Sequence, residues 1–289
     1  MSPTVAHALA QARGLGLTRL DAQVLLGHQL GRPRTWLLAH DDAALAPLAL
    51  QAYLANCELR AQGVPLAYLV AEREFHGLTL AVSPAVLVPR PDTETLVDWA
   101  LELLQGLPQS AAPQVLDLGT GSGAIALAIK QAWPGAQVLA TDASAAALDV
   151  AQANAQRLGL TIAFRLGSWW QAVAGEAFDL VLSNPPYVAE GDAHLAALRH
   201  EPHQALVSGP AGLDDLKVII AGAGMHLRGR GSLLVEHGAG QAPAVLGLMA
   251  KAGLAPMGTL RDLAGLERCS GGQATDDRHN GDAPAPHPL

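Results

Sequence analysis

The stretch Val181-Leu182-Ser183-Asn184-Pro185-Pro186-Tyr187 ends a mostly apolar run with two prolines. Because proline has no N–H for a β-ladder and fixes its own φ, a strand over residues 178–183 stops there and the chain turns. The Asn184 amide and the carbonyls of Asn184 and Pro185 are then left as acceptors at the carboxyl end of a strand, where open α/β sheets bind ligands. Such acceptors suit a planar –NH2 group, with the Tyr187 ring covering one of its faces. A proline-rich turn after a buried strand explains the same tetrapeptide, so its weight depends on the rest of the chain.

Strands and helices alternate beyond Pro113. Apolar runs predict strands over residues 114–118, 137–141, 162–166, 178–183 and 232–236. Helical spacing predicts helices between them, over residues 124–133, 145–158, 213–227 and 241–252. This alternation predicts an α/β fold with a doubly wound parallel sheet. A last pair of strands, 255–261 and 266–270, joined by Asp262-Leu263-Ala264-Gly265, predicts an antiparallel hairpin at one edge of the sheet.

The chain divides into four predicted segments. Residues 1–71 carry apolar positions at helical spacing and are predicted to form a small helical bundle. Residues 72–90 are predicted to form a connecting β-hairpin, with strands over 75–82 and 86–88 and a turn at Ser83-Pro84. Residues 91–273 hold the α/β domain, whose first helix takes Asp92 as its N-cap. The tail, residues 274–289, has no periodicity and is expected to be disordered.

The composition narrows the classes of function. A net charge of −8 argues against a broad nucleic-acid surface and leaves a basic protein partner open. The cysteines and histidines show no ligand spacing, so neither a disulfide framework nor a metal site is expected. The chain has no basic-then-apolar leader and no apolar run long enough to cross a bilayer. We therefore expect a cytoplasmic protein without a membrane partner.

A second motif, Asp117-Leu118-Gly119-Thr120-Gly121-Ser122-Gly123, closes the first strand of the predicted sheet and opens a helix. Glycines at such a junction let the backbone turn tightly and approach a ligand closely. With Ala124 the motif also fits the dinucleotide pattern G-x-G-x-x-A, so a nicotinamide-dependent enzyme is a competing interpretation. The next strand ends near Asp142, about 20 residues after the loop, where a carboxylate binds ribose hydroxyls under either interpretation.

Two features favour S-adenosylmethionine over a dinucleotide. Asp117 stands just before the glycines and can accept from an ammonium group, whereas a pyrophosphate would be repelled there. The Asn-Pro-Pro-Tyr motif is predicted at the same edge of the sheet and suits a planar nitrogen. A sulfonium nucleotide with an amino-acid tail fits both features. We therefore predict S-adenosylmethionine as the cofactor, bound by Asp117, residues 119–123, Asp142 and Asn184.

Together the two motifs resemble those of the class I (Rossmann-like) methyltransferases that modify planar amino or amide nitrogens. Arg90-Pro91-Asp92-Thr93-Glu94 and Phe75-His76-Gly77 narrow the resemblance to the protein-glutamine N5-methyltransferases of the HemK/PrmC family. Trp36-Leu37-Leu38-Ala39-His40 and Glu201-Pro202 agree with the same family. The resemblance covers most of the chain, in order and with compatible spacing.

The resemblance implies methyl transfer from S-adenosylmethionine to the side-chain amide N5 of the glutamine in the Gly-Gly-Gln motif of peptide chain release factors. It implies catalytic roles for Asn184, Pro185 and Tyr187, substrate contacts by the whole Asn184-Pro185-Pro186-Tyr187 turn, and a place for Trp169 at the adenine. Residues 1–71 have a helical texture and no reactive constellation, so they are predicted to recognise the protein substrate. The enzyme is expected to be a monomer. A ribosomal protein glutamine, or an exocyclic amine of a nucleic-acid base, is the alternative substrate. One departure from the family is Ser168, where an acid is usual.

The chain also contains its own Gly271-Gly272-Gln273 triplet, after the last predicted strand and before the predicted tail. Chance explains such a triplet well. A mobile Gln273 would nevertheless reach the active site of a neighbouring molecule, so slow self-methylation at Gln273 is predicted when the enzyme is held with cofactor alone.

Overall fold

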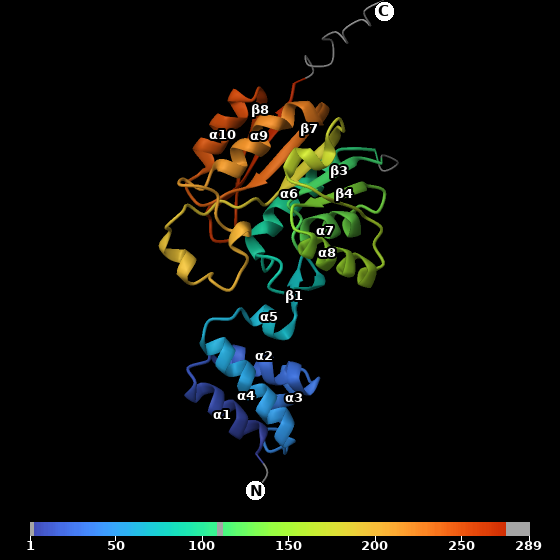
Figure 1. The fold of residues 1–289 in the computed structure, drawn as a ribbon. Helices are drawn as coiled ribbons and strands as arrows, with labels where there is room; N and C mark the ends of the chain where they lie inside the picture. Colours follow the sequence, from blue (N-terminus) through green and yellow to red (C-terminus); the bar gives the residue numbers. More distant parts are fainter. Residues whose placement is uncertain (1–2, 109–111, 276–289) are drawn as a thin grey trace, which may run out of the picture.

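The computed structural model describes residues 3–108 and 112–275 and shows a small helical bundle joined to a larger α/β body (Figure 1). The bundle and the short helix that follows it comprise α1 (Val5–Gly14), α2 (Arg19–Leu30), α3 (Arg34–Ala39), α4 (Pro47–Ala61) and α5 (Leu66–Val70). The helices of the body are α6 (Glu94–Gln105), α7 (Ala124–Ala132), α8 (Ala145–Leu158), α9 (Asp214–His226) and α10 (Ala242–Lys251), with short 3-10 turns η1 (Pro91–Thr93), η2 (Trp169–Val173), η3 (Ala193–Ala196) and η4 (His203–Ala205). None of the helices in the described residues is both long and apolar enough to cross a bilayer.

Seven strands of the body form one sheet, in the order β5-β4-β3-β6-β7-β9-β8. Their bounds are β3 (Gln114–Leu118), β4 (Gln137–Asp142), β5 (Ala163–Leu166), β6 (Phe178–Ser183), β7 (Leu227–Glu236), β8 (Leu254–Arg261) and β9 (Glu267–Ala274). The first five in the sheet order are parallel, and β9 runs antiparallel between β7 and β8. The chain winds outward from β3 to β5 and then returns to place β6 on the other side of β3. The predicted doubly wound sheet with an antiparallel edge hairpin is confirmed.

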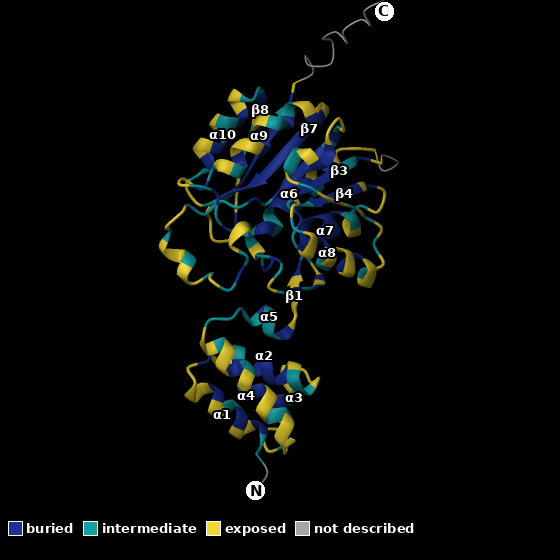
Figure 2. Ribbon diagram, viewed as in Figure 1, coloured by how far each residue is buried: buried dark blue, intermediate teal, exposed yellow. Residues whose placement is uncertain are grey.

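Alternation along the central strands explains why helices cover both faces of the sheet. Val115 of β3 and Leu180 of β6 pack against α6 and α7, whereas Leu116 and Val181 pack on the side of α9 and α10. Figure 2 shows the strands dark blue between helices whose outer faces are yellow. Strands covered on both faces are apolar throughout, which is the pattern that the sequence carries. The same alternation turns Asp117 toward α7.

Helix α5 contributes to the cores of both parts of the molecule. Leu66 and Val70 belong to the core of the bundle, whereas Ala67 packs with buried valines that precede α6. The Tyr68 hydroxyl donates to the Val86 carbonyl at 2.6 Å. The predicted boundary between residues 71 and 72 therefore follows an element that the two cores share.

The connecting hairpin differs from its prediction. Its strands are β1 (Glu72–Phe75) and β2 (Leu78–Ala81), and its turn is at His76-Gly77 rather than Ser83-Pro84. His76 and Gly77 have φ of 48° and 77°, the pair of positive values that a two-residue hairpin turn requires. The predicted strand 86–88 forms no ladder in the structure. Its backbone is bound by a side chain instead, because the Val88 amide donates to Oε2 of Glu201 at 3.1 Å.

The last strand is longer than predicted, and this overturns the basis for self-methylation. Gly271 pairs with Leu234 of β7, and a Cβ at Gly271 would lie 2.6 Å from the Trp99 ring. Gln273 lies inside β9, where its side-chain amide donates to the Arg230 carbonyl at 3.0 Å. The predicted self-methylation at Gln273 is therefore withdrawn, because the residue belongs to the sheet and not to a free tail. Apart from Ala274 and Thr275, the predicted disordered tail lies outside the described residues.

Candidate active site

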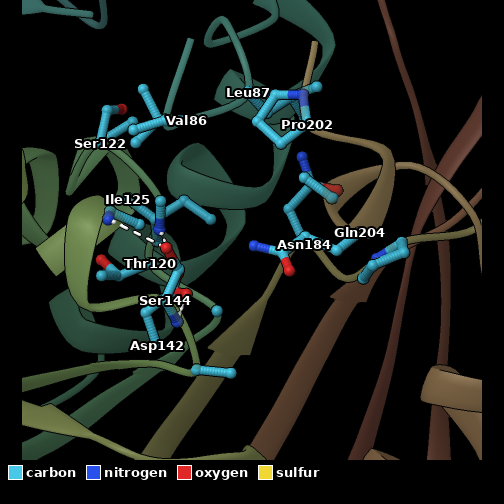
Figure 3. A pocket seen from close by; sticks show the side chains of 18 of the residues that line it. Val86, Leu87, Thr120, Ser122, Ile125, Asp142, Ser144, Asn184, Pro202 and Gln204 are labelled. Atoms are coloured by element: carbon cyan, nitrogen blue, oxygen red, sulfur yellow. Dashed lines mark hydrogen bonds between the residues drawn. The ribbon is translucent and has the colours of Figure 1, made fainter. Parts of the chain in front are cut away.

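A cavity of about 280 Å³ opens at the carboxyl ends of β3, β4 and β6, where the winding of the sheet reverses. The predicted site residues that line it are Gly119, Thr120, Gly121, Ser122, Asp142, Trp169, Asn184 and Pro186. Those that do not line it are Asp117, Gly123, Pro185 and Tyr187. Figure 3 shows Asn184 across the cavity from Thr120, Asp142 and Ser144. The two motifs singled out in the sequence therefore form opposite walls of one cavity.

Asp142 is held rigidly at the end of β4. Its Oδ2 accepts from the Gly121 amide at 2.9 Å, and its Oδ1 accepts from the Ser144 amide at 2.8 Å. Burial raises the pKa of this carboxyl, and its backbone hydrogen bonds oppose that rise. A carboxylate has about four acceptor positions, so Asp142 retains acceptors for ligand hydroxyls. Gly121, with φ of 55° and open space where a Cβ would stand, leaves the approach clear.

Asp142→Ala should weaken the binding of S-adenosylmethionine by about 1–3 kcal/mol, the usual cost of unpairing a hydrogen bond to a charged group. The matched control is Asp149→Ala, which removes an exposed carboxylate from the helix that follows Asp142. Isothermal titration calorimetry of both variants tests the assignment. Equal affinities for the two variants would exclude Asp142 from the cofactor site.

Asp117 lies beneath the glycine loop and has no exposed surface. Its Oδ2 accepts from the Thr120 hydroxyl at 2.6 Å and from the Ala126 amide at 3.2 Å, which ties the loop to the first turn of α7. Its Oδ1 has no hydrogen-bond partner among the described residues. Burial raises the pKa of Asp117 to about 7, against the lowering effect of both hydrogen bonds. A direct contact between Asp117 and an ammonium group stays a prediction.

Asp117→Asn should stabilise the ligand-free protein increasingly as the pH rises from 5 to 8. The carboxyl has a pKa of about 7 when folded and about 3.9 when unfolded, so the folded state favours its protonated form. Its contribution to stability is therefore lost as the pH rises from about 3.9 to about 7, by on the order of 4 kcal/mol in total, most of it above pH 5. Asparagine does not ionise and escapes that loss. Thermal unfolding across the pH range measures the difference, and a difference that does not grow with pH contradicts the assignment.

The Asn184 side chain has a defined orientation. Its Nδ2 donates to the Thr93 hydroxyl at 3.0 Å, and its Oδ1 accepts from no donor among the described residues. Thr93 lines the same cavity and stands at the N-cap position of α6, the place that the sequence assigned to Asp92. Asp92 lies in η1 instead, 3.3 Å from the Arg268 guanidinium. The amide oxygen of Asn184 is thus a free acceptor in the cavity wall.

Tyr187 stands behind the cavity and is anchored to a buried acid. Its hydroxyl donates to Oε1 of Glu236 at 3.1 Å. Glu236 is fully buried at the end of β7, and burial raises its pKa to about 7. Hydrogen bonds from Thr93 and Tyr187 and the nearby Arg268 charge lower that pKa, whereas Asp92 raises it. The tyrosine therefore fixes the turn from behind, and its ring is not part of the cavity wall.

Trp169 closes the end of the cavity next to Gly119. Its indole N–H donates to Oδ1 of Asp215 at 3.0 Å, and a Cβ added to Gly119 would lie 3.2 Å from its ring. Trp169 has φ of 43°, an uncommon value for a residue with a large side chain. Ser168 also lines the cavity, and Asp215 brings a carboxylate to this end.

Comparisons with known proteins show which family the chain resembles. The methyltransferase small domain model matches residues 94–209, and the PrmC N-terminal domain model matches residues 4–70. The release factor glutamine methyltransferase of Xylella fastidiosa (strain Temecula1) is 49% identical over 275 residues, covering 94% of this chain and 98% of that protein. The chain belongs to the release factor glutamine methyltransferase family.

Two further relatives of the same description agree. The protein from Bordetella pertussis is 50% identical over 260 residues, 89% of this chain and 95% of its own. The one from Escherichia coli K12 is 40% identical over 270 residues, 92% of this chain and 96% of its own. The predicted family, the predicted methyltransferase activity and S-adenosylmethionine as methyl donor are confirmed by this membership.

Solved structures confirm the fold of this family member. A methyltransferase from Pyrococcus furiosus superposes with a TM-score of 0.51 at 17% identity, covering 69% of this chain and 90% of that one. The hMettl16 catalytic domain superposes with a TM-score of 0.56 at 17% identity, covering 77% and 83%. At such identities the likeness establishes a methyltransferase fold and nothing finer.

Sequence reasoning missed three residues that support the site, namely Thr93, Asp215 and Glu236. In the sequence Thr93 is one residue of the motif at residues 90–94, and a threonine before a helix is equally well explained as an ordinary helix cap. Asp215 reads as an acid in the first turn of a helix, which the helix dipole explains. Glu236 carried the one usable signal, since an acid that ends an apolar strand of a parallel sheet lies at the edge where ligands bind.

Proposed function

We propose that this release factor glutamine methyltransferase transfers a methyl group from S-adenosylmethionine to N5 of the glutamine in the Gly-Gly-Gln motif of a peptide chain release factor. The observation that carries the proposal is the pairing of two walls across one cavity. The glycine loop and Asp142 form one wall, and Asn184 presents a free amide oxygen in the other. The names of the relatives support the substrate.

The residues of the first wall fit the cofactor. Asp142 keeps acceptor positions for the two ribose hydroxyls, and Gly121 leaves the approach open. The unpartnered Oδ1 of Asp117, just beneath the loop, is an acceptor suited to a cationic amino-acid tail. Trp169 offers an aromatic surface at the other end of the cavity. When bound, S-adenosylmethionine supplies an electrophilic methyl group on a sulfonium.

The second wall fits a glutamine side chain. The amide nitrogen is a poor nucleophile because its lone pair is delocalised into the carbonyl. As the nitrogen forms its bond to the methyl carbon, the carbon–sulfur bond of the donor would break and the donor would leave as a neutral thioether. Positive charge develops on the N–H groups, and acceptors fixed against those groups stabilise that charge until one N–H proton is lost to solvent. Asn184 Oδ1, in the cavity wall, is one such acceptor. We propose the Pro185 carbonyl as the other, because Pro185 stands between two residues of that wall and no described donor reaches its carbonyl. The remaining rate acceleration comes from positioning, because the cavity would hold the substrate amide nitrogen in line with the methyl group of the cofactor.

The same acceptors would also suit an exocyclic amine of a nucleic-acid base or a ribosomal protein glutamine. The net charge of −8 disfavours a nucleic-acid substrate, and the relatives named for release factors cover almost the whole chain. We propose accordingly that the enzyme acts as a monomer on a protein, without direct contact to nucleic acid. Residues 1–71 are proposed to recognise the body of that protein.

Methyl transfer to purified substrates tests the function. The enzyme is incubated with methyl-labelled cofactor and a bacterial release factor, with ribosomal protein and RNA in parallel reactions. We expect label on one glutamine of the release factor, located by mass spectrometry, and none when that Gly-Gly-Gln glutamine is replaced by alanine. Label on RNA, or on a different glutamine, would contradict the proposal.

A further inference from the structure

Two residues outside the Asn-Pro-Pro-Tyr turn connect its first and last members. Thr93 accepts from the Asn184 side-chain amide at 3.0 Å, and its hydroxyl also interacts with the Glu236 carboxyl and lowers the pKa of that acid. Tyr187 donates to Oε1 of the same carboxyl at 3.1 Å. Within the described residues, the Oε2 atom of Glu236 has no hydrogen-bond partner, so it is the acceptor position left open for the Thr93 hydroxyl. One buried carboxyl thus interacts with both hydroxyls.

The sheet itself brings Glu236 to this position. In the parallel pair of β6 and β7, Ser183 is the partner of Val235. Asn184 follows the last residue of β6 and Glu236 is the last residue of β7, so the two residues lie next to each other at this edge of the sheet. Glu236 is completely buried, and the guanidinium nearest to it, that of Arg268, pairs with Asp92 and Asp262 instead. A buried acid without an ion pair is costly, and a purely structural position would favour an apolar residue.

The Thr93 hydroxyl has no role in capping a helix. Thr93 ends η1 and precedes α6 with helical φ and ψ of −67° and −20°, so its side chain is not placed to accept from a backbone amide of the first turn. Its hydroxyl makes no such bond here. Thr93 is 4% exposed, and the part that reaches the surface lines the cavity. The hydroxyl is therefore committed to Asn184 and Glu236.

The direction of each hydrogen bond follows from the chemistry of the acceptor. Above its pKa of about 7 Glu236 is ionised and only accepts hydrogen bonds. The Tyr187 hydroxyl donates to it, and it is the acceptor available to the Thr93 hydroxyl. The lone pairs of Thr93 are then left to accept, and only the nitrogen end of the Asn184 amide can donate to them. The oxygen end is consequently the end left free for a ligand.

We propose that Thr93 and Glu236 are positioning residues that fix the Asn184 amide with its oxygen, rather than its nitrogen, available to the substrate amide. This inference rests on the proposed function, in which that oxygen binds an N–H of the substrate glutamine. If the Asn184 amide were reversed, its NH2 group would face an N–H of the substrate amide, and two hydrogen-bond donors would oppose each other. The orientation therefore decides whether the cavity accepts an amide nitrogen.

Side-chain amide exchange tests the orientation without any substrate. In the 15N-labelled full-length protein at pH 8, hydrogen exchange of the Asn184 Nδ2 protons should accelerate about ten-fold in Thr93→Val, which has the same shape but no acceptor. Thr93→Ser keeps the acceptor and should match the wild type within about two-fold. Equal exchange rates in Val and Ser variants would overturn the inference, whatever the enzyme methylates.

Kinetics on a Gly-Gly-Gln peptide test whether this orientation matters for methyl transfer. The wild-type rate on the same peptide tests the proposed function itself. Thr93→Val should lower kcat about ten-fold with unchanged cofactor affinity, and Thr93→Ser should restore it. In an Asn184→Asp background Thr93→Val should cost less than about two-fold, because a carboxylate has an acceptor at both ends. A full loss in that background would show that Thr93 acts independently of Asn184.

Glu236→Gln separates positioning from stability. Removing a buried charge should raise the melting temperature at pH 8, while the single amide oxygen can no longer accept from both hydroxyls, so kcat should fall about ten-fold. A variant that is more stable yet slower supports the inference. A variant that is more stable and equally fast would contradict it.

Discussion

Asn184→Ala should reduce methyl transfer by about two orders of magnitude or more and leave the affinity for S-adenosylmethionine within about two-fold. Loss of one preorganised hydrogen-bonding partner of a developing charge has effects of this size in other enzymes. The cofactor contacts proposed here come from the glycine loop and Asp142, on the opposite wall of the cavity. The Asn184→Ala substitution removes the free Oδ1 acceptor and leaves the opposite wall unchanged.

The measurements are single-turnover methyl transfer to the release factor and calorimetric titration of the cofactor. Asn184→Asp is the matched control, because it keeps an acceptor at the same position and differs by one atom type. We expect this control to lie between the wild type and Asn184→Ala in rate. If the affinity for the cofactor fell in parallel with the rate, the division of labour between the two walls would be wrong.

The parts of the fold that were predicted closely are those whose signal is local. β3, β6 and α8 have the predicted bounds, because apolar runs end at glycine or proline and Ser144 caps its helix with a hydrogen bond to the Ala147 amide. The glycine loop and the Asn-Pro-Pro-Tyr turn lie where the ends of parallel strands must meet. Topology alone therefore brought the two motifs to one cavity.

The parts that were missed depend on contacts between distant segments. The hairpin turn at His76-Gly77 uses a histidine with positive φ, stabilised by its amide donating to the Glu94 carboxylate 18 residues away at 3.0 Å. The strand containing Gly271 was ended too early because glycines weaken strand propensity. The Trp99 ring and the Leu234 side chain, which a Cβ at Gly271 would clash with, show why glycine is needed there. Glu236 and Thr93 likewise acquire their roles only through neighbours in space.

Removal of residues 1–62 should abolish most activity on an intact release factor while sparing both cofactor binding and a short peptide substrate. All the residues that line the cavity come from Phe75 or later in the chain, so the chemical site is complete without the bundle. A truncation that begins at Gly63 keeps α5, whose Ala67 and Tyr68 pack against the body. A second point of attachment for a protein substrate can raise its overall affinity by about 10²–10⁴-fold, and that gain is what the truncation loses.

The experiment compares rates on the release factor and on a Gly-Gly-Gln peptide, for the intact and the shortened chains at the same cofactor saturation. We expect the rate on the release factor to fall at least about 100-fold and the rate on the peptide to change by less than about five-fold. Because the bundle contacts Leu66 and Val70 of α5, the truncation exposes apolar surface, and the melting temperature of the cofactor-bound chain controls for a loss of stability. Equal losses on both substrates, with a lowered melting temperature, would mean that the bundle only stabilises the catalytic body. A loss confined to the release factor places substrate recognition in the bundle and the chemistry in the sheet.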